Sequence, residues 1–231
     1  MSRRINHKGL NHQKILIWIK IIMKVIGLYS GKLTNIGEKR SPTGIFKQSV
    51  SLVSVNELGI IGDIQADKRF HGGPEKALHQ YALCSYEKII KRYPLLHKQA
   101  RSGMIGENLS VIDMNERNVC IGDIYKVGSA VLQVSSPRIP CWKINAKFKQ
   151  PNLHQFIGLH RLNGWYYRVL QAGDIALDDV FILQQRPNAN VSVDIMLKVI
   201  NSEAQLVEVV TNAVGLDPEW RRRLQKKYSL D

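Results

Sequence analysis

The sequence lacks several features that mark common structural and functional classes. Its 231 residues include only three cysteines, Cys84, Cys120 and Cys141. This odd, low count rules out a disulfide framework and is typical of a reducing compartment, so we expect a cytoplasmic protein. We find no nucleotide-binding glycine fingerprint, no zinc-finger spacing and no aromatic RNA-binding strand. These absences argue against a nucleotide-binding protein and against specific nucleic-acid recognition.

Long apolar runs are also missing. The apolar stretch at residues 15–19 ends at Lys20 and is much shorter than the roughly 20 residues of a transmembrane helix. No small-residue cleavage site follows it, so a secretory signal fits poorly. We interpret residues 1–22, which contain no acidic residue, as a poorly packed N-terminal extension. An interfacial membrane anchor is the rival interpretation, but we expect no stable membrane insertion.

Acidic residues are scarce relative to basic ones. The chain contains 33 Lys and Arg against 19 Asp and Glu, a formal net charge of +14 at pH 7. A basic surface attracts nucleic acid, anionic lipid or small anionic ligands. Most of the cations are scattered along the sequence, so charge alone does not indicate a nucleic-acid partner. A hydrophobic content of 44% is ordinary for a globular protein that buries a full core.

Short strands dominate the hydrophobic pattern up to about residue 185. Asn163-Gly164 followed by an aromatic-rich run predicts a β-hairpin. Many short strands separated by Gly and Asn turns favour a mainly β barrel or sandwich. The strands that we predict cover residues 24–29, 49–52, 124–127, 130–135, 165–170 and 180–183.

Helical signals interrupt the strands and then replace them near the C-terminus. Pro74 suits the first position of a helix that continues to residue 83, and Ser85 can cap a second helix that ends near Arg92. After Pro187 we predict a C-terminal module, residues 188–231, attached to a β domain at residues 23–187. The three helices of this module are expected at residues 192–200, 202–212 and 217–227, the last with Asp217 as its N-cap.

The segment SSPRIPCWK, residues 135–143, places one cysteine directly after a predicted strand. Two prolines fix their own φ angles and disfavour helix before them, so Cys141 follows a semi-rigid arm. Arg138 and Lys143 favour the thiolate, which can ligate a soft metal or attack an electrophile. A small buried hydrophobe in a kinked loop is the alternative.

A second candidate site is His71-Gly72-Gly73-Pro74. Paired glycines let a ligand approach the backbone, and the free N–H groups of the following predicted helix favour an anion. Lys76 adds a positive charge, so this segment is a candidate phosphate cradle. A tight turn without a ligand is the alternative.

Zinc binding and Cys-His hydrolysis are two further chemistries to weigh. His71, His79, Cys84 and Cys141 supply suitable zinc ligands, but no pair has the close spacing of structural zinc sites. A hydrolase would use Cys141 as nucleophile and His71 or His79 as base. The sequence does not show whether these side chains meet.

Four segments occur in an order that is specific to one family. They are GDIQADKRFHGGPEKALHQY at 62–81, GENL at 106–109, VCIGD at 119–123 and PRIPC at 137–141. With this set the chain resembles the MOSC domain family, specifically its YiiM-type branch, from about Met23 to the C-terminus. The resemblance implies a MOSC β-barrel followed by a small three-helix C-terminal module.

The resemblance also implies a cofactor, a reaction and partners. MOSC domains bind the molybdenum cofactor, a pterin dithiolene that carries a phosphate, and related enzymes reduce N-hydroxylated bases in detoxification. The two electrons would come from a separate flavin- or haem-containing reductase. An alternative is a cofactor or sulfur carrier, with a persulfide on its cysteine and no turnover of its own. A homodimer is compatible with either interpretation.

Site residues follow from the same resemblance. Cys141 is expected to ligate molybdenum or to handle sulfur. His71, Lys76 and Asp63 are candidate donors of the proton that the departing oxygen needs. For Arg69 and Arg138 a structural salt bridge is the alternative role. The residues expected to bind the cofactor are Arg69, Gly72, Gly73, Lys76, Asn108 and Arg138.

Overall fold

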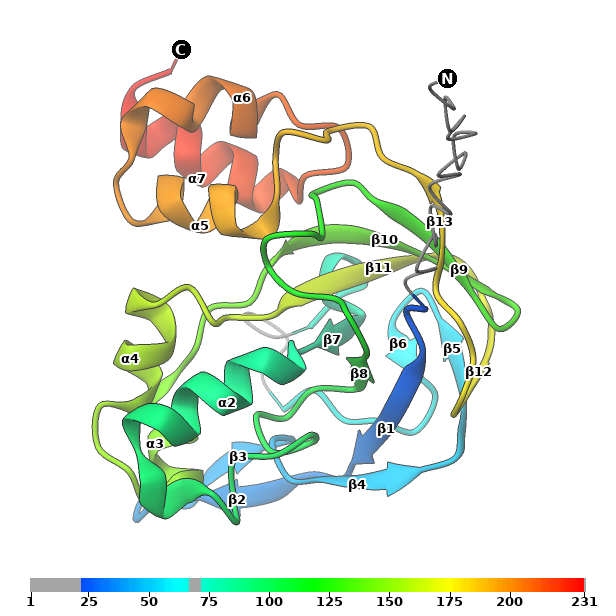
Figure 1. Ribbon diagram of the computed structural model, residues 1–231, viewed down its shortest axis with the longest axis vertical. Helices are drawn as coiled ribbons and strands as arrows, with labels where there is room; N and C mark the ends of the chain where they lie inside the picture. Colours follow the sequence, from blue (N-terminus) through cyan, green and yellow to red (C-terminus); the bar gives the residue numbers. More distant parts are fainter. Residues whose placement is uncertain (1–21, 67–71, 231) are drawn as a thin grey trace, which may run out of the picture.

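The computed structural model of the chain describes residues 22–66 and 72–230 (Figure 1). The N-terminal extension expected at residues 1–22 therefore lies almost entirely outside the described residues. Two predicted site residues, Arg69 and His71, also lie outside them.

A curled eight-stranded sheet forms the body of the molecule as a half-barrel (Figure 1). Its strand order is β13-β9-β10-β11-β7-β8-β1-β4, and only the β7–β8 pair is parallel. A three-stranded sheet, β12-β5-β6, and the β2–β3 hairpin complete the strands. The predicted mainly β fold is confirmed. The strands are β1 (Val25–Gly31), β2 (Thr34–Ile36), β3 (Ser41–Thr43), β4 (Lys47–Val50), β5 (Leu52–Asn56), β6 (Gly59–Ile60), β7 (Leu78–Gln80), β8 (Leu109–Val111), β9 (Ile124–Val127), β10 (Ala130–Pro137), β11 (Trp165–Gln171), β12 (Gly173–Ala176) and β13 (Ile182–Gln185).

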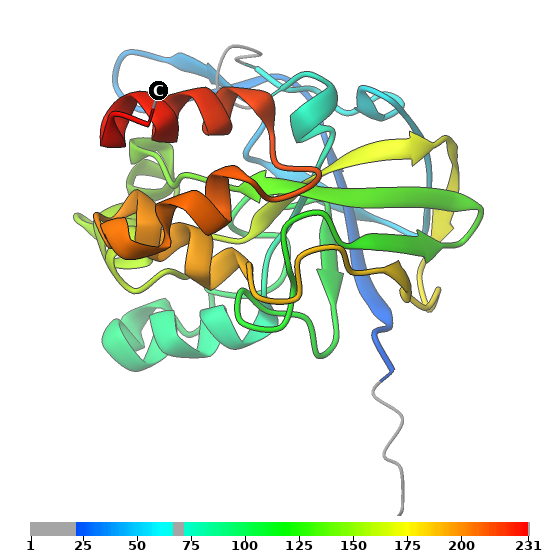
Figure 2. The same ribbon diagram turned by 90° about the horizontal axis from the view of Figure 1, so that it is seen from above.

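The helices gather on one side of the molecule and the sheets on the other (Figures 1 and 2). The C-terminal trio α5, α6 and α7 matches the predicted three-helix module. The Asp217 side chain caps α7 as expected, and the Ser192 side chain caps α5. Within the described ranges, no helix is long and apolar enough to cross a membrane. The helices are α2 (Leu83–Arg92), α3 (Trp142–Phe148), α4 (Leu153–Leu159), α5 (Val193–Ile200), α6 (Val207–Thr211) and α7 (Pro218–Tyr228), with 3-10 turns η1 (Pro74–Lys76), η2 (Pro94–Leu96) and η3 (Ala204–Leu206).

One hydrophobic core runs from the half-barrel into the C-terminal helices. Val134 and Trp165 of the sheet are fully buried in the same cluster as Met196 of α5, Val210 of α6 and Leu224 of α7. A second cluster lies beneath α2, α3 and α4. The change from strands to helices near residue 187 is therefore not a break in the core.

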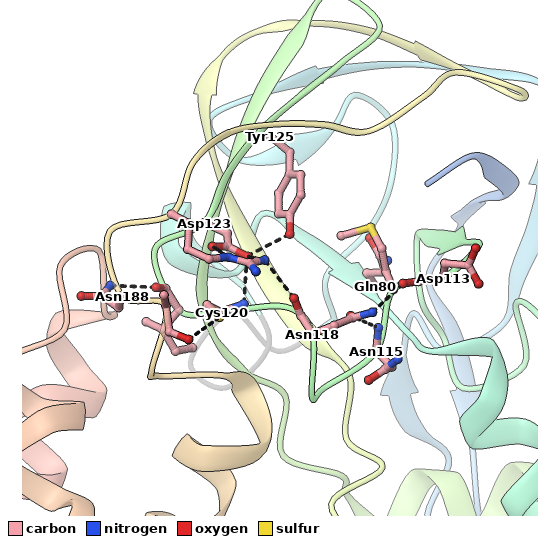
Figure 3. Close-up of polar contacts among 12 residues, drawn as sticks. Gln80, Asp113, Asn115, Asn118, Cys120, Asp123, Tyr125 and Asn188 are labelled. Carbon is pink, nitrogen blue, oxygen red and sulfur yellow. Dashed lines mark hydrogen bonds and ion pairs between the residues drawn. The ribbon is translucent and has the colours of Figure 1, made fainter. Parts of the chain in front are cut away.

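A buried carboxylate ties the strands to the segment that leads into the C-terminal helices (Figure 3). Asp123 has no exposed surface and accepts hydrogen bonds from the Tyr125 hydroxyl at 2.9 Å and the Cys120 backbone N–H at 2.9 Å. Arg186 donates to both carboxylate oxygens, at 2.9 and 2.7 Å. The Gly122-Asp123 motif, one of the segments that carry the resemblance, therefore serves the fold.

The predicted helix at residues 74–83 is wrong. The turn η1 ends at Lys76, and β7 then pairs with β11 on one side and with β8 on the other. All three residues of β7 are buried between these partners. Pairing with strands that are distant in sequence has overridden the local helical signal.

Three local expectations are also corrected. The residues after Asn163-Gly164 form β11 as predicted, but the preceding element is α4, so the pair does not close a hairpin. The N-cap of α2 is Ala82, and Ser85 lies buried in the first turn. The single strand predicted at residues 49–52 is divided between β4 and β5.

Candidate functional site

A cavity brings together segments that are far apart in the sequence. Five predicted site residues line it: Asp63, Lys76, Asn108, Arg138 and Cys141. Gly44 and Ile64 line it as well, and a Cβ atom on Gly44 would lie 2.1 Å from the backbone oxygen of Ile64. Glycine is required there because the two segments of the wall approach so closely.

Cys141 reaches this cavity from the end of β10. The strand ends at Pro137, and Cys141 is the N-cap residue of α3, in an extended conformation. Its backbone oxygen accepts the Ile144 N–H at 3.0 Å, which begins the helix. The thiol is partly exposed. The strand and the helix together fix the backbone of Cys141 at the cavity wall.

Arg138 is a buried cation that lines the cavity. Its exposed fraction is 6%, and its backbone is held by Gly164 O, which accepts at 3.1 Å, and by Asn163 Nδ2, which donates at 2.8 Å. The Nη1 atom is buried and forms no hydrogen bond with any residue that the structure describes. Arg138 forms no ion pair with any described residue. An unsatisfied guanidinium N–H is costly in a protein interior, so this atom is a natural partner for an anionic ligand.

Asp63 belongs to a buried ion pair. Its carboxylate accepts hydrogen bonds from Lys47 Nζ at 2.5 Å, Asn108 Nδ2 at 2.9 Å and the Gly31 backbone N–H at 2.7 Å. The Asp63 and Lys47 side chains are each only 6% exposed. Burial lowers the pKa of Lys47, although the charge of Asp63 opposes this effect. These contacts suit an ionised carboxylate that organises the wall, and they do not favour a proton-donor role for Asp63.

Asn108 links this ion pair to the sheet. Its Nδ2 also donates to Tyr29 O at 3.1 Å, and its Oδ1 accepts the His79 backbone N–H at 3.1 Å. The amide orientation is therefore fixed by three elements at once. Sequence reasoning missed Lys47, because nothing in its local pattern separates it from any other lysine on a strand.

The predicted phosphate cradle is only partly formed. Lys76 lines the cavity, but neither Gly72 nor Gly73 is among the described residues of the wall. Gly73 has a φ of 88°, and a Cβ atom there would meet no atom within 4 Å. The glycine therefore serves the turn. The turn that follows it is only three residues long, so it lacks the helix N-terminus that we expected to bind an anion.

The remaining wall includes two rings and one further cation. His79 and Tyr166 are buried with ring centroids 5.5 Å apart, and burial raises the pKa of Tyr166. Lys143 Nζ donates to Pro42 O at 2.6 Å. Among the described residues, the charged side chains of the wall are one carboxylate, Asp63, and four cations, Lys47, Lys76, Arg138 and Lys143.

An adjacent lysine extends this positive region. Lys147 Nζ donates to the backbone oxygen of the cavity residue Ile45 at 2.9 Å. Burial lowers the pKa of Lys147 to about 8, and the charges of Arg138 and Lys47 act in the same direction. The whole region favours an anionic ligand.

The structure bears differently on the two alternative chemistries, zinc binding and Cys-His hydrolysis. Within residues 22–66 and 72–230, no three His, Cys, Asp or Glu side chains form a group that could hold a metal ion. Cys84 on α2 and Cys120 before β9 do not line the cavity. Cys141 and His79 do line it together, as a Cys-His pair would require.

Comparisons with known proteins identify relatives of the chain. The sequence pattern of the MOSC domain matches residues 67–181. The protein YiiM of Escherichia coli (strain K12) is 32% identical over 206 residues, which cover 87% of this chain and 91% of that protein. A protein named Reductase, from Gibberella moniliformis, is 42% identical over 146 residues. That match covers 62% of this chain but only 26% of the fungal protein.

Solved structures of YiiM share the fold. The crystal structure of YiiM from Geobacillus stearothermophilus gives a TM-score of 0.73 at 30% identity, covering 89% of this chain and 99% of that chain. YiiM from Escherichia coli gives a TM-score of 0.75 at 27% identity, covering 90% and 92%. The chain therefore belongs to the MOSC domain family, and within it to the YiiM-type branch.

Proposed function

We propose that the chain binds a molybdenum cofactor in the Cys141 cavity and reduces N-hydroxylated bases or related N-oxygenated compounds. The observation that carries this proposal is the wall itself, where a partly exposed thiol lies among four described cations, one of which, Arg138, has a buried Nη1 that is bonded to no described residue. Membership of the MOSC family supports the cofactor, since MOSC domains are associated with molybdenum-cofactor binding. The relative named Reductase supports a redox reaction.

The donor set fits this cofactor. A thiolate is a soft ligand that suits a molybdenum centre. Among the described residues, no three His, Cys, Asp or Glu side chains form a group that could hold a bare metal ion. The sulfur donors of a dithiolene would complete the coordination that Cys141 begins. The phosphate and pterin of such a cofactor are polar and anionic, which matches Arg138, Lys76 and Lys143.

The residues of the chain then have distinct tasks. Arg138 would bind an anionic group of the cofactor through Nη1, and the Asp63–Lys47 pair would keep Asn108 oriented. When bound, the cofactor supplies a centre that accepts and donates two electrons. Reduction of N–OH to N–H and water also consumes two protons. Of the predicted proton donors, Lys76 would deliver one of these protons from Nζ at the cavity wall.

The electron source would be a separate reductase that carries a flavin or haem. This chain shows no nucleotide-binding fingerprint, so it has no evident site for a nicotinamide donor. The fungal relative extends well beyond the region that matches this chain. Such an arrangement is compatible with electron delivery from other domains or from another protein.

The test is the content of the purified full-length protein. We expect molybdenum by inductively coupled plasma mass spectrometry and a pterin by mass spectrometry of the released, oxidised cofactor. The loaded protein should reduce an N-hydroxylated purine when a chemical electron donor is supplied. Protein from cofactor-producing cells that contains neither molybdenum nor pterin would refute the proposal.

Comparison of Cys141→Ser with Cys84→Ser tests whether Cys141 is the molybdenum ligand. Cys141→Ser should lose molybdenum and activity while keeping the melting temperature of the cofactor-free wild type, because the thiol is partly exposed and its loss opens no cavity in the core. Cys84→Ser, away from the cavity, should keep both. The carrier alternative predicts a different result. Intact-mass analysis would then find one extra sulfur atom on the wild-type chain, removed by reductant and missing from Cys141→Ser, with no molybdenum.

A further inference from the structure

We propose that Glu219, in the C-terminal helix α7, is a positioning residue that holds the Lys76 ammonium at the cavity wall. Lys76 Nζ lies 3.1 Å from Glu219 Oε2, and the two side chains are 11% and 36% exposed. Among the described residues, Glu219 is the one that forms a hydrogen bond with the Lys76 ammonium. The inference rests on the proposed function only for the identity of the anion that Lys76 meets.

The first turn of α7 is fixed relative to the cavity. The Asp217 backbone N–H donates to Ser135 O of β10 at 3.0 Å, and the Asp217 side chain accepts the Glu219 N–H at 2.8 Å. The same strand leads on to Arg138 and Cys141. Glu219 therefore lies on a helix whose N-terminal end is hydrogen-bonded to β10. This is the strand that leads to Arg138 and Cys141.

The backbone beneath Lys76 is fixed as well, but its side chain is not. The backbone oxygen of Glu75 accepts the Ser135 hydroxyl, and the Glu75 carboxylate pairs with Arg168 of β11. These contacts hold η1 against the sheet. They do not involve the long Lys76 side chain, and holding that side chain in one rotamer costs entropy. The contact with Glu219 selects the rotamer that lines the cavity.

Glu219 itself is ionised near neutral pH. Partial burial alone would raise its pKa, but the hydrogen bond and charge of Lys76, together with the charges of Arg223 and Arg222, hold the pKa below its ordinary value. Its other oxygen pairs with Arg223. A carboxylate this close to an anion site also repels the anion. Positioning of Lys76 strengthens anion binding, whereas repulsion by the Glu219 charge weakens it. Substitutions at Glu219 can therefore separate the two effects.

Two substitutions separate them. Glu219→Gln keeps an oxygen that accepts from Lys76 but removes the charge, whereas Glu219→Ala removes both. If positioning dominates, Ala weakens anion binding and Gln largely rescues it. If Glu219 acts only by repulsion, both variants bind the anion more tightly than the wild type.

The assay is isothermal titration of the full-length protein with inorganic phosphate at low ionic strength. We expect Lys76→Ala to weaken phosphate binding about tenfold, as expected for one charge-assisted hydrogen bond, and Glu219→Ala by about three- to tenfold. Glu219→Gln should stay within about twofold of wild type. The matched control is Glu208→Ala on α6, an exposed site with the same change in net charge, which should also stay within about twofold.

A double-mutant cycle tests whether Glu219 acts through Lys76. In a Lys76→Ala background, Glu219→Ala should cause no further loss, since the side chain that it positions is absent. The proposal is overturned if Glu219→Ala binds phosphate as tightly as wild type, if the two losses add, or if the wild type binds no phosphate. These titrations use full-length protein made without the cofactor, so that the cavity is free to bind phosphate. If phosphate binding follows the cycle but protein from cofactor-producing cells contains no molybdenum, the positioning role stands and the proposed function fails. If Glu219→Ala binds phosphate normally while protein from cofactor-producing cells contains molybdenum, the proposed function stands and the positioning role fails.

Discussion

Replacing Asp63 by Asn should destabilise the fold strongly, because it leaves a buried lysine without its counter-charge. Lys47 is 6% exposed, and its Nζ donates to Asp63 Oδ2 at 2.5 Å. In the variant, an amide oxygen can still accept from Gly31, but the amide N–H₂ then faces the donors of Lys47 and Asn108. Breaking a buried ion pair from one side costs about 3–5 kcal/mol. That is a large part of a typical total stability of about 5–15 kcal/mol.

Thermal unfolding of the full-length protein measures this effect. A loss of this size corresponds to a drop in melting temperature of roughly 6–20 °C for a chain of this length. Asp178→Asn is the matched control, since Asp178 pairs with Lys24 at 2.7 Å on the surface, with side chains 76% and 40% exposed. That pair should contribute at most about 1 kcal/mol. The reasoning is refuted if Asp63→Asn melts no lower than Asp178→Asn.

The pH dependence gives a second check on the same variant. Loss of Asp63 removes the charge that supports the Lys47 ammonium, so the folded-state pKa of Lys47 falls further below its unfolded value of about 10.4. Between those two values the unfolded chain binds more protons than the folded chain. Stability of the variant should therefore rise with pH across that window. The double variant Asp63→Asn, Lys47→Met should recover part of the lost stability and lose this pH dependence.

Three further predictions concern other parts of the fold. Because the folded-state pKa of Lys147 is about 8, its burial penalty is complete below about pH 8 and is relieved as pH rises toward about 10.4. Urea unfolding should therefore show Lys147→Met more stable than wild type at pH 7, with the difference shrinking above pH 8. Asp123→Asn should lose about 3–5 kcal/mol in the same assay, because Arg186 loses its charged partner. A chain that starts at Met23 should keep the melting temperature and activity of the full chain, as expected if residues 1–22 are a poorly packed extension.

The parts of the fold that were predictable have local signals. β9 matches the predicted residues 124–127, where alternation ends at a glycine. α7 begins at Pro218, where Asp217 supplies the cap and proline suits the first helical position. These signals depend only on residues that are neighbours in the sequence. They are therefore reliable even where tertiary packing is unknown.

The wrong predictions concern segments whose structure depends on residues far away in the sequence. Residues 78–80 carry a helical signal but pair with β11 and β8, whose residues lie far along the chain. The Asn163-Gly164 pair precedes a strand as predicted, yet the antiparallel partners of that strand are β7 and β10, and β10 lies on the other side of α3 and α4 in the sequence. No local pattern contains this information. Only the assembled sheet decides which segments become neighbours.

In the candidate site too, some residues could be predicted from their local sequence and others could not. Cys141 and Arg138 could be singled out because prolines and cations surround them in the sequence. Lys47 pairs with a residue 16 positions away, and Glu219 with one 143 positions away, so neither has a sequence neighbourhood that marks it. The family resemblance supplied Asp63 and Asn108, but not the lysine that holds them together.

The C-terminal helices are therefore more than an appendage to the half-barrel. Their apolar residues lie in the same core as β10, and Asp217 is bonded to that strand just before the segment that carries Arg138 and Cys141. Through Glu219, the same helix contacts Lys76 on the wall of the cavity. Because α7 is attached at both points, a displacement of the helix would disturb the strand that leads to the thiol and the cation together. The site is built by long-range contacts, and the helical module supplies one of them.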